Sequence, residues 1–202
     1  MRFEELVELA ITQSGARSQR PVIEKELLHF DLLFCLDEAG LLDQLTFQGG
    51  TALRLCYGSN RLSEDLDFAG GKHFSSKDLH EIKECIEDYI GARYNLPVHV
   101  REPKSLLHEP GYGEVRVDKW QVSVVTSPAR PDLPQQRIKL EIASVDAHTR
   151  EPRPLAKHYN FLPAGYQDTL VMTESMEEIM ADKLVAFVAS SRYIRYRDIW
   201  DL

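Results

Sequence analysis

The sequence is poor in the features that mark secreted, zinc-binding or membrane-spanning chains. It has only three cysteines in 202 residues, and these are widely spaced without a C-x-x-C pair. Neither a disulfide framework nor a zinc knuckle is therefore expected. No apolar run approaches the roughly 20 residues that span a bilayer, and the N-terminal segment MRFEELVELAITQSG is amphipathic and acidic, unlike a signal peptide. We expect a soluble, cytoplasmic protein without a membrane partner.

The chain also lacks internal repeats and an excess of basic residues. Its formal net charge is −8 at pH 7. This charge argues against indiscriminate binding of polyanions, although a local basic patch remains compatible with a nucleic-acid partner. Hydrophobic residues make up 43% of the chain and charged residues 28%, which is enough to bury one good core with helical additions.

Hydrophobic periodicity predicts helices towards both ends of the chain and strands between them. Helices are predicted over residues 2–13, 21–44, 51–58, 75–94 and 174–191, with a further helix beginning near residue 195. Strands are predicted over residues 44–48, 65–71, 97–102, 119–127 and 136–144. This order favours an α+β fold with a mixed sheet, helices on one side of it, and helical N- and C-terminal parts.

The segment DLDF places two carboxylates on one face of a predicted strand. Side chains alternate along a strand, so Leu66 and Phe68 point to one side while Asp65 and Asp67 point to the other. Two neighbouring anions repel each other unless a cation bridges them, and a hard divalent ion such as Mg²⁺ is suited to this. The alternative is the solvated face of an exposed strand.

A glycine pair precedes these aspartates, between a predicted strand and a predicted helix. Gly49 and Gly50 allow close approach of the backbone to a ligand, and the N–H groups of the helix start, which includes Thr51, can bind an anion. Arg61 and Ser63 add a cation and a hydroxyl suited to phosphate oxygens. The segment is neither a P-loop nor a dinucleotide fingerprint, and a simple tight turn is the alternative. Together with the aspartates, it favours binding of a nucleoside triphosphate with metal ions.

Six segments, in order along the chain, resemble the AbiEii/AbiGii toxin family of the nucleotidyltransferase superfamily: IEKELL, FQGGTALRL, RLSEDLDF, IKLEIAS, ADKLVAF and RYRDIWDL. The resemblance runs from about Val22 to the last residue. Members of that family resemble the minimal nucleotidyltransferase fold and carry a G-G/S and then a D-x-D signature. They act as toxins of toxin–antitoxin or abortive-infection systems by transferring nucleotides, in some members to tRNA.

The resemblance implies roles for the residues in these motifs. Asp65 and Asp67 become the metal ligands, and Gly49, Gly50 and Ser63 contact the triphosphate. Gln48 departs from the family pattern, because many relatives have a lysine before the glycines; Arg54 or Arg61 could supply the missing charge.

A third carboxylate normally completes such a site from a neighbouring strand. In RIKLEIA, alternation turns Lys139 and Glu141 away from the apolar side chains, so Glu141 is the matching metal ligand. A glutamate here departs from the superfamily's aspartate, and a polar strand face is the alternative.

The resemblance also places a lysine and an R-x-x-D element near the nucleotide. Lys183 would neutralise the triphosphate, and Asp198, in a segment that also contains Asp201, would hold that lysine or orient the attacking hydroxyl. Ordinary surface roles are the alternative for both. The basic and aromatic cluster SSRYIRYR could hold an RNA backbone, or form a solvated helix face with buried tyrosine rings.

We therefore expect a nucleotidyltransferase-like domain over residues 1–168 and the start of a truncated helical part over residues 169–202. The expected activity is Mg²⁺-dependent transfer of a nucleotide from an NTP to an acceptor, for example tRNA or another RNA, by a toxin with a cognate antitoxin. One alternative is a non-catalytic nucleotide-binding or partner-binding module on the same fold. Another is an antibiotic-modifying nucleotidyltransferase, which shares the core and differs in its acceptor pocket.

Overall fold

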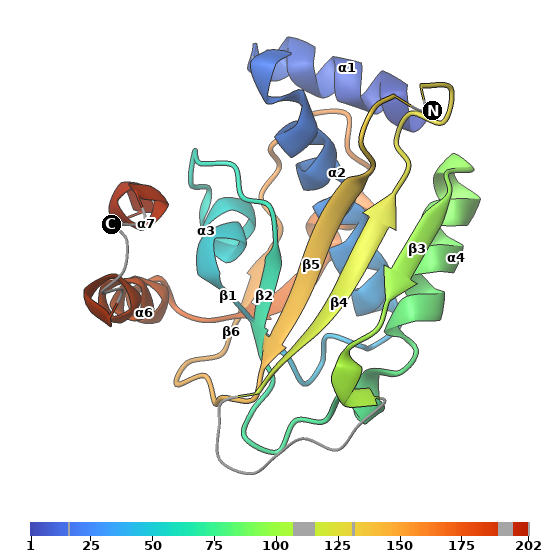
Figure 1. Ribbon diagram of the computed structural model, residues 1–202. Coiled ribbons are helices and arrows are strands. Elements are labelled where there is room, and N and C mark those ends of the chain that lie inside the picture. Colours follow the sequence, from blue (N-terminus) through green and yellow to red (C-terminus); the bar gives the residue numbers. More distant parts are fainter. Residues whose placement is uncertain (16, 107–115, 131, 190–195, 202) are drawn as a thin grey trace.

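A seven-stranded mixed sheet forms the centre of the computed structural model, which describes residues 1–15, 17–106, 116–130, 132–189 and 196–201 (Figure 1). The strand order is β3-β4-β5-β2-β1-β7-β6. The strands are β1 (Thr46–Gln48), β2 (Leu66–Ala69), β3 (Val98–Arg101), β4 (Val117–Val124), β5 (Gln136–Ala143), β6 (Glu151–Pro154) and β7 (Leu170–Thr173). The β2–β5 and β1–β7 pairs are parallel, and the other pairs are antiparallel.

Helices cover one face of the sheet, and further helices lie beside β1 and β2. The α-helices are α1 (Phe3–Ser14), α2 (Arg20–Glu38), α3 (Gly49–Tyr57), α4 (Ile82–Tyr94), α5 (Gly165–Asp168), α6 (Met176–Ala189) and α7 (Tyr196–Asp201). Short 3-10 turns span Arg17–Gln19, Ser76–Leu79 and Lys104–Leu106. In Figure 1, α2 and α4 lie behind β3, β4 and β5, and α6 and α7 lie beside α3 at the left of the view.

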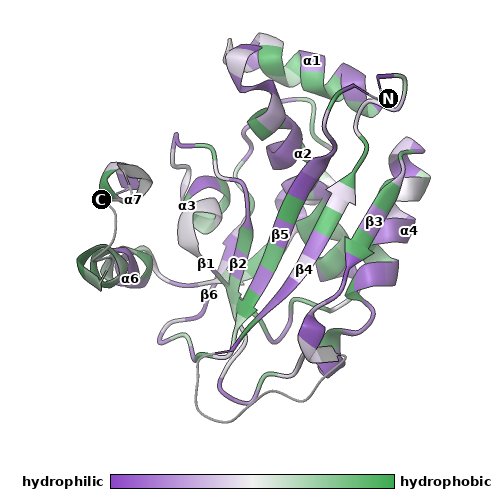
Figure 2. Cartoon of the chain, viewed as in Figure 1, coloured by the Kyte–Doolittle hydropathy of each residue, from purple (hydrophilic) through white to green (hydrophobic). Residues whose placement is uncertain are grey.

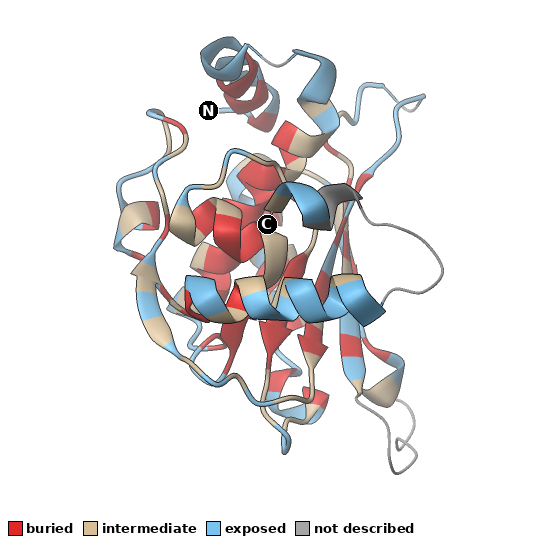
Figure 3. Cartoon of the chain, turned by 90° about the vertical axis from the view of Figure 1, so that its left-hand side faces the viewer, coloured by how far each residue is buried: buried red, intermediate tan, exposed pale blue. Residues whose placement is uncertain are grey.

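Period-two alternation explains why the sheet has one buried and one open face. In β5, Ile138, Leu140 and Ile142 are fully buried, whereas Arg137 and Lys139 are exposed. The alternating hydropathy along β4 and β5 is visible in Figure 2. Buried residues concentrate in the sheet and in the helices behind it, while α6 shows mainly exposed residues (Figure 3). The open face is therefore available to polar chemistry.

The predicted α+β fold with a mixed sheet is confirmed, with several differences in detail. The helix predicted over residues 21–44 is too long, because α2 ends at Glu38 and residues 39–44 form turns. The predicted helix over residues 75–94 is divided into a 3-10 turn and α4, which begins at Ile82. Strands β6 and β7 were not predicted. β6 contains Pro152 and Pro154, which cannot donate ladder hydrogen bonds, and it lies at the edge of the sheet, where proline is tolerated. β7 is only four residues long, and its sequence LVMT does not alternate between apolar and polar residues.

The expected division of the chain at residue 168 falls just before β7. Because β7 pairs in parallel with β1, the sheet continues across that position. No helix in the described parts of the chain combines the length and apolar character needed to cross a membrane.

Candidate active site

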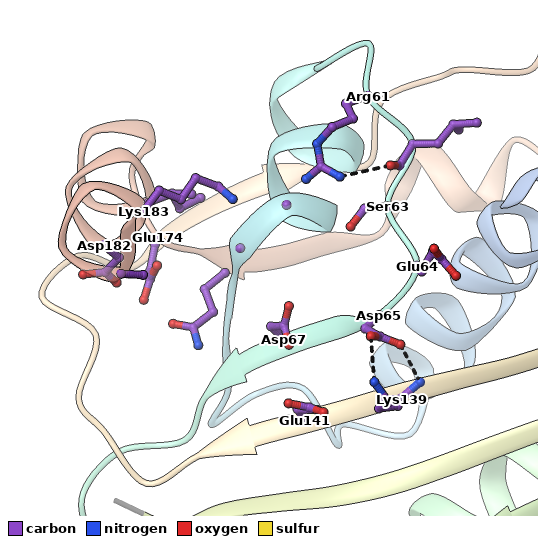
Figure 4. A pocket seen from close by; sticks show the side chains of 16 residues that line it. Arg61, Ser63, Glu64, Asp65, Asp67, Lys139, Glu141, Glu174, Asp182 and Lys183 are labelled. Atoms are coloured by element: carbon purple, nitrogen blue, oxygen red, sulfur yellow. Dashed lines mark hydrogen bonds and ion pairs between the residues drawn. The ribbon is translucent and has the colours of Figure 1, made fainter. Parts of the chain in front are cut away.

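A cavity of about 750 Å³ opens between the front of β1, β2 and β5 and the facing side of α6 (Figure 4). Its walls bring together segments that are far apart in the sequence. The residues that line it are Gln48, Gly49, Gly50, Arg61, Leu62, Ser63, Glu64, Asp65, Asp67, Lys139, Glu141, Glu174, Ile179, Asp182, Lys183 and Ala186. They include these predicted site residues: Asp65, Asp67, Glu141, Gly49, Gly50, Arg61, Ser63 and Lys183.

Strand register brings the three predicted carboxylates onto one wall. Asp67 of β2 lies opposite Glu141 of β5 on one side and Gln48 of β1 on the other. Asp65 immediately precedes β2 and points to the same side as Asp67 (Figure 4). Glu141 therefore stands beside the aspartates, as the alternation of β5 predicts.

Two lysines hold two of these carboxylates. The Lys139 backbone N–H and Nζ donate to Asp65 at 3.1 and 3.3 Å, and Lys119 Nζ donates to Glu141 at 3.0 Å. The charge of Asp65 raises the pKa of Lys139. Among the described residues, no group of three or more His, Cys, Asp or Glu side chains is arranged to hold a metal ion. The oxygen donors still suit Mg²⁺ chemically, but a metal on Asp65 and Glu141 would have to displace these lysines.

The glycine pair at the start of α3 lies so close to the carboxylates and cations that a side chain at either position would have to displace its neighbours. Gly49 has φ +78°, and a Cβ there would lie 3.1 Å from Asp67 Oδ2. A Cβ at Gly50 would overlap the Arg61 guanidinium and lie 3.2 Å from Ser63 Oγ. This packing leaves the first N–H groups of α3 beside the cavity, where an anion can approach them.

Thr51, predicted to contact the nucleotide, has its side chain in the interior instead. It is 1% exposed, and its hydroxyl donates to the carbonyl oxygen of Asp65. The side chain therefore supports the loop that carries Asp65 rather than lining the cavity.

A buried carboxylate joins two of the cations that line the cavity. Asp201 in α7 accepts hydrogen bonds from Arg61 Nε at 2.5 Å and Arg61 Nη2 at 2.6 Å, and Lys183 Nζ lies 2.7 Å from Asp201 Oδ2. Burial acts to raise the pKa of Asp201, but the hydrogen bonds from Arg61 and Lys183 outweigh it, so the net shift is downward. Asp201 therefore remains ionised and holds Lys183.

That holding role was predicted for Asp198, whose side chain lies outside the described residues, as does most of the SSRYIRYR cluster. Arg54, one of two predicted substitutes for the lysine missing at Gln48, is instead held by Glu26 at 2.9 and 3.0 Å and does not line the cavity. Arg61 does line it, so the available guanidinium comes from Arg61.

Sequence reasoning missed two acidic groups on the α6 side of the cavity, Glu174 and Asp182. Glu174 links β7 to α6, and its backbone N–H donates to the Phe47 carbonyl at 3.0 Å. Its side chain is buried, and its Oε2 has no hydrogen-bond partner among the described residues. Burial, and then the charges of Glu178 and Asp182, raise the pKa of Glu174 to about 8. Nothing local in the sequence distinguishes this glutamate, because its position depends on the unpredicted strand β7.

Comparison with known proteins supplies the family. Two solved structures from Helicobacter pylori are similar. JHP933 is 23% identical with a TM-score of 0.52, and the match covers 90% of this chain and 64% of JHP933. A candidate nucleotidyltransferase is 22% identical with a TM-score of 0.51, and the match covers 89% of this chain and 65% of that protein. This chain thus spans less than two thirds of either relative, and at these identities the likeness concerns the fold. No curated protein sequence matches significantly. The family model described as "Nucleotidyl transferase AbiEii toxin, Type IV TA system" matches residues 31–202. The chain therefore belongs to the AbiEii nucleotidyl transferase toxin family.

Proposed function

We propose that the protein is a metal-dependent nucleotidyltransferase that transfers a nucleotide from a nucleoside triphosphate to an acceptor hydroxyl. The observation that carries this proposal is that one cavity holds a row of three carboxylates on the sheet, here called the anionic side, and a pair of cations joined by Asp201, here called the cationic side. Lys139 lies beside the former, and Glu174 and Asp182 lie beside the latter. Asp65, Asp67 and Glu141 line one wall, and Arg61 and Lys183 line another, with the Gly49–Gly50 turn beside them. A triphosphate with its counter-ions matches this distribution of charge.

The cationic side would bind the phosphates. Arg61, Lys183 and Ser63 offer a guanidinium, an ammonium and a hydroxyl, and the start of α3 adds backbone N–H groups. Asp201 holds Arg61 and Lys183 in place, so both cations are ordered before a ligand arrives. Their charge would also stabilise the pyrophosphate as it leaves.

The anionic side would serve the acceptor. Asp65, Asp67 and Glu141 would hold Mg²⁺, which lowers the pKa of a bound hydroxyl and neutralises phosphate charge. The acceptor oxygen forms a bond to the α-phosphorus while the bond from that phosphorus to the pyrophosphate oxygen breaks. The proton of the acceptor hydroxyl passes to a carboxylate of this cluster, and pyrophosphate leaves towards Arg61 and Lys183.

We propose that the biological role is that of a toxin, held in check by a cognate antitoxin, with tRNA or another RNA as acceptor. Membership of the AbiEii family supports the toxin role. The decisive test is incubation with each α-labelled triphosphate, Mg²⁺ and total RNA. Label should enter an RNA species with release of pyrophosphate, and neither should occur with Asp65→Asn or with a chelator.

A non-catalytic nucleotide-binding or partner-binding module is the second candidate. The ion pairs of Lys139 with Asp65 and of Lys119 with Glu141 favour it, because they neutralise two of the three carboxylates without a metal. Tight triphosphate binding without any release of pyrophosphate would identify the module and overturn the transferase.

A further inference from the structure

The open face of the sheet carries a group of basic side chains, most of which lie outside the cavity. On β3, β4 and β5 the outward residues are His99, Arg101, Val117, Lys119, Gln121, Ser123, Arg137, Lys139, Glu141 and Ala143. We call this set the open-face patch. In Figure 1, α2 and α4 lie behind β3, β4 and β5 and cover the face on which the other side chains of these strands are buried, so the patch belongs to the opposite face.

The patch is strongly basic in a chain whose net charge is −8. Arg101, Lys119, Arg137 and Lys139 are its cations, and Glu141 is its only carboxylate. Asp118, the other acidic residue on these strands, is 3% exposed and belongs to the buried face. Charge of one sign has therefore been gathered on one face, next to the cavity.

Strand register arranges these residues in rows across the sheet, and one row ends at the cavity. Arg101 lies opposite Gln121, and Gln121 lies opposite Lys139, whose Nζ reaches Asp65. Three inter-strand steps of about 4.8 Å make this row about 14 Å long. In the neighbouring row, His99 lies opposite Ser123, and Ser123 lies opposite Arg137. The first row thus leads from the edge strand to the proposed catalytic carboxylates, with a cation on β3 and another on β5.

The composition of the patch suits a phosphate backbone better than a protein partner. Protein interfaces have an apolar core with few charged residues, whereas Val117 is the only large apolar side chain of the patch and lies at one end of β4. Spaced cations with hydroxyl, amide and imidazole groups between them match phosphates and ribose 2′-hydroxyls. Arg101 and Arg137 are exposed, and neither guanidinium forms a hydrogen bond or ion pair within the described part of the chain.

We propose that the open-face patch binds the sugar-phosphate backbone of an RNA acceptor and directs its reacting end into the cavity. This inference rests on the proposed transferase function, to which it adds the path of the acceptor. Arg101 and Arg137 bind phosphates at the far side of the patch, and Lys139 and Lys119 bind those nearest the carboxylates.

The test compares two double charge reversals by fluorescence anisotropy with a labelled RNA hairpin that has a short single-stranded 3′ end. Arg101→Glu with Arg137→Glu alters the patch. Arg17→Glu with Lys157→Glu makes the same change in net charge at exposed positions outside it. The patch variant should bind RNA at least tenfold more weakly, with a shallower dependence of log K on log salt by roughly 1.5. The control should match the wild type, and both should bind triphosphates normally, because none of the four residues lines the cavity.

Equal RNA affinity and equal salt dependence in the two double variants would overturn the proposed RNA-binding role of the patch. A wild type that does not bind the hairpin would also overturn it. A protein would then be the better partner for this face. The outcomes separate the two proposals. RNA binding that depends on the patch without nucleotide transfer would overturn the transferase alone. Transfer to RNA that is equally efficient in both double variants would overturn the patch alone.

Discussion

The guanidinium of Arg61 and the carboxylate of Asp201 form a two-pronged ion pair between residues 140 positions apart, at 2.5 and 2.6 Å. Asp201 is 1% exposed and Arg61 is 21% exposed in their side chains. Hydrogen bonds of this kind depend on both partners being present, because a buried charge left alone is costly. The pair attaches α7 to the loop that precedes Asp65 and Asp67.

The first prediction measures this pair by a double-mutant cycle. Asp201→Ala leaves Arg61 and Lys183 without their shared anion and should lower the free energy of unfolding by about 1–3 kcal/mol. Arg61→Ala in the Asp201→Ala background should cost less than it does in the wild type. Urea unfolding of the four proteins gives the coupling free energy. Simple additivity of the two substitutions would show that the pair contributes nothing to stability.

The second prediction separates chemistry from folding at Asp65. Asp65→Asn keeps an oxygen that can accept from the Lys139 N–H, now at 3.1 Å, but removes the charge. Nucleotide transfer should fall by about a hundredfold or more. The melting temperature should change little, because the Lys139 side chain is half-exposed and an ion pair at such a position contributes little to the free energy of unfolding. Labelling kinetics and thermal melting provide the two readouts.

The same variant tests toxicity. At matched soluble levels, the wild type should arrest growth and Asp65→Asn should not. Arrest by both proteins would mean that toxicity comes from binding rather than from transfer.

The third prediction concerns the close approach at Gly50. In Gly50→Ala the new methyl group occupies space held by the Arg61 guanidinium. Arg61 should be displaced, and triphosphate affinity should fall about tenfold, which corresponds to about 1.4 kcal/mol. Gly91→Ala is the matched control, since a Cβ at Gly91 in α4 meets no atom within 4 Å. That control should stabilise the helix by about 0.5–1 kcal/mol and leave affinity unchanged. Calorimetric titration of both variants decides the matter; equal affinities would remove Gly50 from the site.

The fourth prediction uses the buried carboxyl of Glu174. Its pKa is raised from 4.5 to about 8, so between these values the folded protein keeps a proton that the unfolded chain has lost. Its contribution to stability is therefore intact below pH 4.5 and is lost as the pH rises through about 8. Glu174→Gln, which is neutral at every pH, should become progressively more stable than the wild type across this window in urea unfolding.

Glu178→Gln is the contrasting variant. Burial opposes ionisation of Glu178, but hydrogen bonds from Thr149 and His148 outweigh it and lower its pKa. Removing its charge should therefore destabilise the protein near neutral pH, where the ionised form contributes stability. If Glu174→Gln also loses stability at high pH, Glu174 is ionised in the folded protein and has a partner.

Local patterns were sufficient to predict the anionic wall of the cavity. Alternation in DLDF and RIKLEIA places Asp65, Asp67 and Glu141 opposite the apolar core, and the paired register of β2 and β5 brings them together. The glycine turn was equally readable, because two glycines separate a strand from a helix start.

The remainder of the site depends on contacts that no local pattern encodes. The Arg61–Asp201 pair joins residues that are 140 positions apart. Sequence reasoning therefore assigned the role of holding Lys183 to Asp198 instead. Glu174 reaches the cavity only because β7 pairs with β1. The ion pairs that Lys119 and Lys139 make depend on which residues face each other across strands, and this register is set by tertiary packing.

The parallel pairing of β1 with β7 has a mechanical consequence. β1 runs directly into the Gly49–Gly50 turn, and β7 runs through Glu174 into α6, which carries Lys183. The two strands meet at Phe47 and Thr173, and the Glu174 N–H donates to the Phe47 carbonyl. The glycine pair and α6, which lie on opposite sides of the cavity, thus each follow directly from one of two strands that pair with each other. A shift of β7 along β1 would change the distance between the Gly49–Gly50 pair and Lys183. The register of these two strands therefore sets how wide a ligand the cavity can hold.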